Sequence, residues 1–211
     1  MKIRFLYCIA LCIFLLSCGG PGVTFEHPQP LDVSDMYEFP KKLWGKYMSM
    51  QDSSVITISD RVISRAFNMK LIACKKDLDT TACYLKNDTL YGRKNKEKQF
   101  VVNIHDTLYI PYHLQDTLFT ISDKHLLRKY KGYYFLNMLY GESWEVQKLE
   151  YSRGKLCLCS ISNKEEIENL RAITEAGNDS ARFQFDPDKK QFHKFLKSKG
   201  FSSREEFVRI R

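Results

Sequence analysis

Three short segments of the chain share one pattern, an Asp-Thr-Leu triplet followed by an aromatic residue. They are residues 88–91, 106–109 and 116–119, and a polar residue precedes each of them. An aspartate side chain can bond its own backbone and so favours a turn, whereas threonine, leucine and an aromatic ring favour the pleated strand that follows. The pattern therefore predicts strands that begin at tight turns. The uneven spacing of the copies, 18 and then 10 residues, argues against a solenoid or a propeller.

The region from about residue 43 to residue 161 continues this alternation of β-forming segments and turns. Its last part is rich in aromatic residues and predicts three long strands over 130–140, 144–151 and 155–161, joined by two turns that each contain glycine. Strands at roughly ten-residue spacing are typical of barrels and sandwiches. We therefore expect a mainly β protein of the α+β class, with an antiparallel meander that forms a barrel or a sandwich.

Helices are expected only near the C-terminus. The segment Ser162–Glu165 has the form of a capping box, with serine as the N-cap, and apolar residues then recur at three-residue spacing. This predicts a helix over 162–174. The Asp-Pro pair at 186–187 predicts the start of a second helix, which Gly200 ends. We expect both helices to cover one face or the mouth of the sheet, and a last strand to follow over 205–210.

The N-terminus of the chain divides into three parts. Lys2 and Arg4 give a short positive region, and an uncharged apolar run from Phe5 to Leu16 follows it. About twelve apolar residues are too few to cross a hydrocarbon core of about 30 Å, which takes about 20. This layout predicts a signal peptide over residues 1–17. A plain secretory signal with a chance cysteine, or a short signal anchor, is the alternative.

The end of this segment, Leu15-Leu16-Ser17-Cys18, resembles the lipobox of bacterial lipoproteins. The resemblance implies cleavage between Ser17 and Cys18, a diacylglycerol on the Cys18 thiol, and stable membrane anchoring by several acyl chains. Gly19, in place of aspartate after the cysteine, is similar to the outer-membrane sorting signal of enteric lipoproteins. The implied location is the cell envelope, with the protein anchored by lipid in the outer membrane and facing the periplasm.

The rest of the chain divides into a leader and a globular part. Residues 18–40 carry four prolines and three glycines with little periodicity, which predicts a flexible tether after the lipidated cysteine. Residues 41–211 are predicted to form a single β-rich domain. Loss of residues 1–17 removes two cations and no acid, so the net charge falls from +8 to +6.

Basic residues gather in two places, at 93–98 and at 189–199. We interpret both as solvated turn and helix faces, which is how most runs of charge behave. Attraction to acidic lipid or polysaccharide surfaces is the alternative. An exported protein is not expected to meet nucleic acid, so we predict no nucleic-acid partner.

Four cysteines follow Cys18, an even number in a compartment where disulfides persist. Cys74 and Cys83 flank a turn-like segment, so a hairpin there would let them face each other and form a disulfide. Cys157 and Cys159 lie two residues apart on a predicted strand and therefore point to one face. For all four, a role as small buried hydrophobes is an equally good interpretation. Their spacing resembles no common metal motif, and we expect no metal.

No motif in the sequence indicates catalysis. The five histidines lack metal-ligand spacing, and the sequence has neither a nucleophile elbow nor a phosphate-binding glycine loop. Glu142 and Glu145 flank Trp144 and could act as the paired carboxylates of a hydrolase, but exposed acids beside a hairpin turn explain them better. We therefore predict no enzymatic activity, no catalytic residue and no cofactor.

The aromatic residues of the three long strands are the best candidate ligand surface. Side chains alternate along a strand, so they cannot all face the core, and the remainder must line a cavity, an interface or solvent. The candidates are Tyr133, Tyr134, Phe135, Tyr140, Trp144 and Tyr151.

The mature chain as a whole resembles small lipoproteins of unknown function from Gram-negative bacteria, some of which have lipocalin-like β-domains. The resemblance rests on the lipobox, the proline-rich leader, the Asp-Thr-Leu segments and the entry sequence Trp44-Gly45-Lys46-Tyr47, in which tryptophan precedes the glycine that it follows in lipocalins. Anchor, leader and aromatic sheet together predict a membrane-tethered, non-enzymatic domain that binds a protein partner or a small apolar ligand. The alternatives are a structural or assembly lipoprotein that docks another envelope protein, and a carboxylate-based hydrolase.

Overall fold

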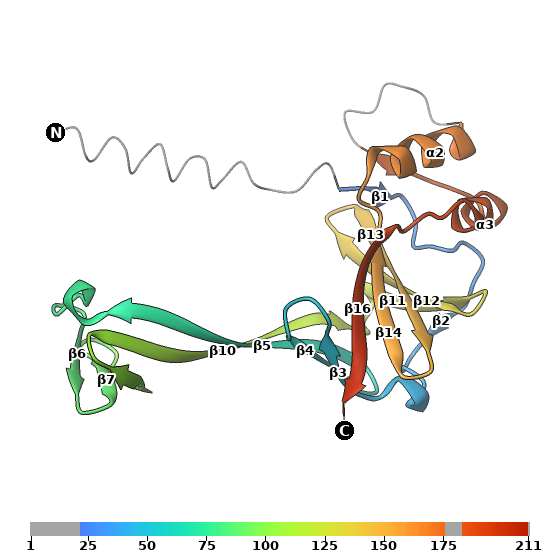
Figure 1. Cartoon of the computed structure of the whole chain (residues 1–211). Coiled ribbons are helices and arrows are strands. Elements are labelled where there is room, and N and C mark those ends of the chain that lie inside the picture. Colours follow the sequence, from blue (N-terminus) through green and yellow to red (C-terminus); the bar gives the residue numbers. More distant parts are fainter. Residues whose placement is uncertain (1–21, 176–182, 211) are drawn as a thin grey trace, which may run out of the picture. The chain divides into compact units, whose positions relative to one another are not determined.

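The computed structural model describes residues 22–175 and 183–210. These residues form mostly antiparallel strands, with two α-helices near the C-terminus (Figure 1). They gather into two compact units: the first contains the described residues up to Glu38 and Ile121–Glu205, and the second contains Phe39–Thr120 and the described residues from Glu206 onward. Strand β16 (Ser203–Ile210) contributes residues to both units.

The first unit is built on a meander of four strands, each antiparallel to the next. Glycines with φ between 62° and 89° stand in its three turns, where a left-handed backbone suits a residue without a side chain. These hairpins confirm the three aromatic strands that the sequence predicts and add one before them. The strands are β11 (His125–Tyr130), β12 (Tyr133–Tyr140), β13 (Ser143–Ser152) and β14 (Lys155–Ser160).

Three short strands extend this meander. At its edge, β2 (Asp35–Met36) pairs with β11. Near the other end of the strands, β1 (Thr24–Phe25) pairs with β13 at Trp144 and, in parallel, with β15 (Gln184–Phe185). Segments from both ends of the chain therefore meet on the same unit.

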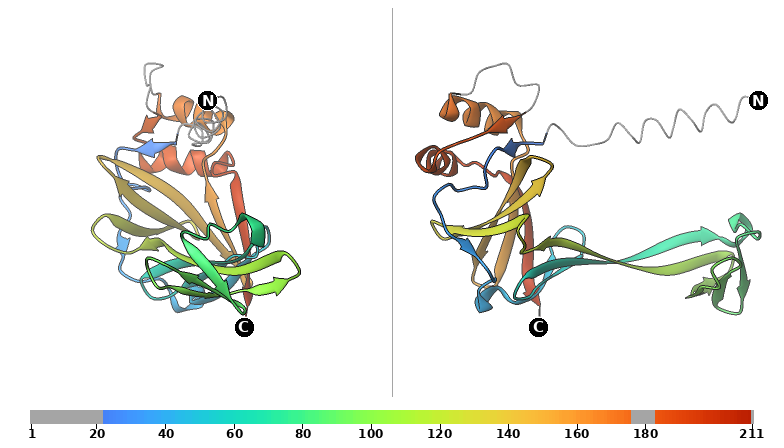
Figure 2. Two further views of the ribbon diagram at one scale, coloured as in Figure 1. Left: turned by 90° about the vertical axis from the view of Figure 1, so that its left-hand side faces the viewer. Right: turned by 180° about the vertical axis from the view of Figure 1, so that it is seen from behind.

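The helices α2 (Lys164–Thr174) and α3 (Lys189–Lys197) lie against each other at one end of the strands of this unit (Figure 2). Their buried side chains form one core with residues of β12, β13 and β14. Four phenylalanine rings lie at its centre with centroids 5.2–6.1 Å apart in edge-on or tilted contacts, an arrangement favoured by the ring quadrupoles. The rings belong to Phe135, Phe192, Phe195 and Phe201.

Both helices begin later than the sequence predicts. The N-cap of α2 is Asn163 rather than Ser162, because Glu166 and not Glu165 completes the capping box. One carboxylate oxygen of Glu166 accepts hydrogen bonds from the backbone of 162 and 163, and the other accepts one from the backbone N–H of Ser202 at 2.6 Å. In α3 the cap is Asp188, two residues beyond the predicted Asp186. For α2, the hydrogen bond between Glu166 and Ser202 joins residues that are remote in sequence. The local sequence pattern therefore could not predict that Glu166 completes the cap.

The second unit starts from a small antiparallel sheet. The short helix η1 (Lys41–Leu43) leads into β3 (Gly45–Ser49), which pairs on one side with the end of β16 and on the other with β4 (Val55–Ile58). The next strand in this sheet is β5 (Val62–Cys74). In the core of this second unit, the fully buried rings of Phe39 and Phe119 meet edge to face with centroids 6.0 Å apart.

The strands β5 and β10 (Thr107–Thr120) are the longest in the protein as described, at 13 and 14 residues. They pair along almost their whole length, which spans about 40 Å at about 3.3 Å per residue. The first part of β5, up to residue 66, also pairs with β4, and residues 107–109 of β10 also pair with β9 (Val102–Ile104). Between these points, residues 67–71 and 110–114 form a two-stranded ribbon, called the arm below (Figure 1).

A second, three-stranded sheet stands at the far end of the arm. The chain passes through the short helix η2 (Lys75–Asp77) into β6 (Cys83–Lys86), β7 (Thr89–Gly92) and β8 (Lys98–Phe100), which are antiparallel. One face of this sheet packs through the buried Leu90 onto Val101 and onto Leu108 of β10. The other face is open. Residues 75–106 are called the tip below.

The structure confirms a mainly β protein with antiparallel strands and two helices near the C-terminus. Among the described residues, the strand orders end at β2 in the first unit and at β9 in the second, so the sheet does not close into a barrel. The sequence predicts one domain over 41–211, whereas the contacts group the described residues into two units.

Two of the three Asp-Thr-Leu segments begin strands as predicted. Asn87 and His105, each with φ of 52°, form the turns before β7 and β10. The prediction of a turn at the third segment, 116–119, is wrong. This segment lies inside β10, opposite residues 63–65 of β5. The long partner strand continues past the aspartate, so the ladder overrides the local preference of that residue for a turn.

The flexible tether predicted over 18–40 is wrong for residues 22–40. Val23, Phe25 and Phe39 are buried, and burial of such side chains gives about 1.5–3 kcal/mol each. The guanidinium of Arg128 donates hydrogen bonds to the carbonyl oxygens of Pro28 and Pro30, the second at 2.8 Å. Residues 22–38 are therefore a packed part of the first unit, and Phe39 packs against Phe119 in the second unit. Residues 18–21 lie outside the described residues.

Candidate functional site

The predicted anchor residues, Ser17 and Cys18, lie outside the described residues, so cleavage and lipidation stay predictions from the sequence. Within the described residues, no helix is both long and apolar enough to cross a membrane.

The six aromatic residues predicted as a ligand surface are divided between the core and the surface. Tyr134 and Phe135 are buried, whereas Tyr140 is 57% exposed at the end of β12. Tyr133 and Trp144 are half-buried and pack against the core beneath the helices. The sixth, Tyr151 on β13, is also half-buried. None of the six lines the three pockets described below.

Cys74 and Cys83 are free thiols, so the predicted disulfide between them is wrong. Cys74 ends β5 opposite Thr107, and Cys83 begins β6 opposite Gly92. The expected hairpin between the two cysteines does not form, because each strand pairs with a different neighbour. The two side chains consequently do not face each other across a ladder.

Cys157 and Cys159 point to one face of β14 as predicted, with Sγ atoms 3.3 Å apart, and Glu150 lies within ligand distance of both. The Glu150 carboxylate already has two cationic partners at 2.9 Å, Lys148 and Arg204. Burial, followed by the neighbouring Cys157, raises the pKa of Cys159 to about 12. Both ion pairs would compete with a metal ion for the oxygens of this carboxylate.

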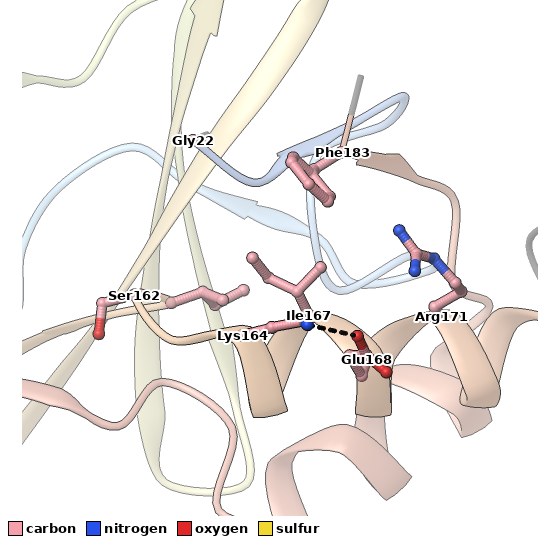
Figure 3. Close-up of a pocket in the computed structure, with 8 residues that line it drawn as sticks. Gly22, Ser162, Lys164, Ile167, Glu168, Arg171 and Phe183 are labelled. Carbon is pink, nitrogen blue, oxygen red and sulfur yellow. Dashed lines mark ion pairs between the residues drawn. The ribbon is translucent and has the colours of Figure 1, made fainter. Parts of the chain in front are cut away.

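A pocket of about 560 Å³ opens beside α2 (Figure 3). Its apolar wall comes from Ile161, Ile167 and Phe183. Lys164 and Glu168 form an ion pair at its rim, with 3.9 Å between Nζ and Oε1. Arg171 lies 5.9 Å from the centre of the Phe183 ring, and its Nε is buried without a hydrogen-bond partner among the described residues. The pocket thus offers an apolar surface and one cation to a small ligand.

The arm carries a continuous apolar face. Residues directly opposite each other in the ladder point to the same side, and three such pairs are Phe67–Leu114, Met69–Tyr112 and Leu71–Ile110. Four of these side chains are 41–48% exposed, and Lys70 points to the other side. At one end of the face the Arg65 guanidinium lies 4.8 Å from the centre of the Phe67 ring. Soluble proteins rarely leave such a contiguous apolar surface uncovered unless it binds something.

The opposite face of the arm and its β5 edge are also open. Lys70, Pro111 and Tyr109 form a small groove of about 250 Å³ with Val102 and Ile104 of β9. Along residues 67–71 and 110–114, each strand pairs with the other and with no third strand among the described residues. The β5 edge therefore presents unpaired backbone N–H and C=O groups, which are a template for strand addition. The β10 edge is interrupted at Pro111, which has no N–H and whose carbonyl oxygen accepts a 3.1 Å hydrogen bond from Nε2 of Gln99.

The structure does not place the two candidate carboxylates of a hydrolase in a described pocket. Glu142 and Glu145, the candidate carboxylates of a hydrolase, are both exposed at the β12–β13 hairpin. Neither lines one of the described pockets, and the single carboxylate in the α2 pocket is that of Glu168, which is ion-paired.

No protein-family model matches the chain, and neither a curated protein nor a solved structure was found to match it.

The arm and the tip are the features that sequence reasoning missed. The signal for the arm is present as a period of two: apolar residues occupy 67, 69, 71 and 73 in β5 and 108, 110, 112 and 114 in β10. Such alternation predicts one buried face, and the sequence alone does not reveal that most of this face has no covering layer.

Proposed function

We propose that the protein is a non-enzymatic docking protein of the bacterial cell envelope, held at the membrane by lipid on Cys18, and that its arm binds a protein partner. The observation that carries the proposal is the apolar face of β5 and β10, which exposes Met69, Leu71, Tyr112 and Leu114. An exposed apolar face of this kind gains free energy when a complementary surface covers it.

The open β5 edge of the arm favours a protein as the occupant over a lipid bilayer. Inside a bilayer, each unpaired backbone group would cost several kcal/mol, because hydrocarbon offers no hydrogen-bond partner. A protein strand could pair with the β5 edge at residues 67–71 and place its own apolar side chains against the exposed face. The partner we infer is thus an envelope protein that presents an apolar strand.

The docking proposal is tested by photo-crosslinking in cells, with a photoreactive phenylalanine at position 71 on the apolar face and, as a control, at position 68 on the other face. We expect one discrete adduct with a second protein from position 71 and at least a tenfold weaker one from position 68. Met69→Lys should abolish the adduct. The same substitution should also abolish binding between the purified protein and its purified partner. Equal adducts from both positions, or an adduct of twice the chain's own mass, would contradict the proposal.

The anchor is tested separately. Cys18→Ala should release the protein from the membrane fraction, and Cys83→Ala, which changes a half-buried thiol at the tip, should leave it there. If the Cys18→Ala variant stays in the membrane fraction under high salt, lipid anchoring at this residue is wrong, whatever the outcome of crosslinking at the arm.

A second candidate function, binding of a small apolar ligand, is favoured by the pocket beside α2. Its volume lies within the usual range for small-molecule sites, about 300–1,000 Å³, and Arg171 would suit an acidic end group. A fluorescent long-chain fatty acid should bind at one site per chain, and Arg171→Gln should weaken this binding about tenfold, as expected for a lost charge-assisted bond. Arg153→Gln, at the β13–β14 turn, is the control, and equal binding by both variants would exclude the pocket.

A further inference from the structure

The open face of the tip combines aromatic rings with cations. Tyr84, Tyr91 and Lys98 are direct cross-strand neighbours on β6, β7 and β8, so their side chains stand in one row on the same face. The two tyrosine rings stack with centroids 5.1 Å apart and planes at 11°. Arg93 lies 5.2 Å from the centre of the Tyr84 ring, and the Lys98 ammonium lies 5.9 Å from that of Tyr91. The row therefore consists of two stacked tyrosine rings, each with a cation close to it.

This row borders a pocket of about 400 Å³, lined by the two tyrosines, Gly92, Arg93, Lys96 and Lys98. No carboxylate lines this pocket. The nearest acid in sequence, Glu97, accepts a 2.6 Å hydrogen bond from the side chain of Asn95. The three cations consequently have no ion-pair partner among the described residues.

Backbone and side-chain bonds fix the loop that carries these cations. The Nε of Arg93 donates to the carbonyl oxygen of Thr80 at 2.8 Å, and the backbone N–H of Arg93 donates to that of Ala82 at 2.9 Å. The terminal guanidinium nitrogens are left to bind another acceptor. Lys96 has a left-handed backbone, with φ of 55°, at the turn between β7 and β8. The Arg93 guanidinium is thus held in place by the loop, and the exposed side chains of Lys96 and Lys98 line the same pocket.

We propose that this pocket at the tip binds a phosphate group. Guanidinium and ammonium groups that converge without a competing carboxylate are the usual donors to phosphate oxygens, and the tyrosine hydroxyls can add uncharged ones. A phosphate group reaches the pocket either as part of an anionic lipid headgroup or as soluble phosphate. This site is independent of the apolar face of the arm and of the anchor at Cys18.

The test uses the whole protein as purified from the expressing cells in neutral detergent and measures binding by titration calorimetry at low salt. Three probes are compared: dihexanoylphosphatidylglycerol, inorganic phosphate and, as a zwitterionic control, dihexanoylphosphatidylcholine. Lys96→Gln with Lys98→Gln should weaken binding of the anionic probes at least tenfold. Lys190→Gln with Lys194→Gln removes the same charge from exposed positions on α3 and should change the affinity less than twofold.

The results distinguish a lipid headgroup from soluble phosphate as the ligand, and both from the absence of a phosphate site. Binding of phosphatidylglycerol at least tenfold tighter than inorganic phosphate assigns the pocket to a lipid headgroup, and the reverse order assigns it to soluble phosphate. Equal weakening by the two double variants, or no binding of either anionic probe, would overturn the proposal. Protection of the β6–β8 amides from hydrogen exchange, measured in each variant, shows that the tip remains folded.

Discussion

Asn137 on β12 binds both sides of the backbone of Gln29. Its Oδ1 accepts a 2.6 Å hydrogen bond from the Gln29 N–H, and its Nδ2 donates a 2.9 Å hydrogen bond to the Gln29 carbonyl oxygen. Both residues are fully buried. The N-terminal segment is therefore held to the meander by a polar contact that water cannot replace.

Asn137→Ala should destabilise the protein and loosen the segment around Gln29. The change leaves a buried N–H and C=O without partners, which costs about 2–3 kcal/mol in the free energy of unfolding. Urea unfolding measures the cost, and limited proteolysis should show cleavage within residues 22–40. Asn169→Ala is the control, because the half-buried Asn169 donates to Ser198 in a hydrogen bond that is exposed to solvent. Equal costs for the two variants would mean that the buried contact adds nothing.

Glu150 should stabilise the first unit in a pH-dependent way. Burial alone would raise its pKa, but hydrogen bonds from Lys148 and Arg204 outweigh burial, and the pKa of Glu150 lies below its ordinary value of 4.5. The contribution is fully present above pH 4.5 and is lost as the pH falls through the lowered folded-state pKa. Glu150→Gln should cost about 1–2 kcal/mol at pH 7, a modest value because the carboxylate is partly solvated.

The unfolding free energies of wild type and Glu150→Gln should therefore converge as the pH falls from 4.5 through the lowered folded-state pKa. The control is Glu168→Gln, which breaks an exposed pair with Lys164 and should cost about 0.3 kcal/mol. If Glu150→Gln lowers the free energy of unfolding by the same amount from pH 7 to pH 3, the charge of Glu150 does not stabilise the fold.

Leu90→Ala should unfold the tip without unfolding the first unit. Leu90, Val101 and Leu108 are the buried residues of a small core, and truncating such a leucine costs about 2 kcal/mol or more. Hydrogen exchange should therefore accelerate at least tenfold in β6–β8 and stay unchanged in β12 and β13. Phe100→Ala, at a side chain that is 62% exposed, is the matched control and should leave both regions protected. Acceleration throughout the chain would indicate that the tip is not a separate folding element.

The parts of the fold that the sequence predicts are those set by local chemistry. The hairpins of β12, β13 and β14 follow from glycine turns and alternating side chains, both of which act over a few residues. The parts it misses depend on remote partners. Phe25 is buried because its strand pairs with β13 and β15 and its ring packs against Phe192 of α3. Residues 116–119 stay in β10 because β5 continues beside them.

The sequence shows which residues make up the candidate sites, but it does not show which of their side chains are exposed. The basic residues at 93–98 stand out in the sequence, and so does the apolar alternation of the arm. Whether Leu71 faces a core or solvent depends on the presence of a covering layer, and no local pattern encodes that layer. The aromatic residues at 133–151 show the converse: Phe135 was a ligand candidate, and the helices cover it.

The pair Cys157 and Cys159 should make the protein sensitive to alkaline pH. Burial raises the pKa of Cys159 from 9.0 to about 12, so the folded state keeps a proton that the unfolded chain loses. Its contribution is fully present below pH 9.0 and is lost as the pH rises toward 12, with a slope of at most about 1.4 kcal/mol per pH unit. Urea unfolding with reductant at pH 8 and pH 10.5 should show a smaller fall for Cys159→Ala than for wild type. Cys83→Ala should fall in parallel with wild type, and a parallel fall of Cys159→Ala would mean that its thiol is not protected by burial.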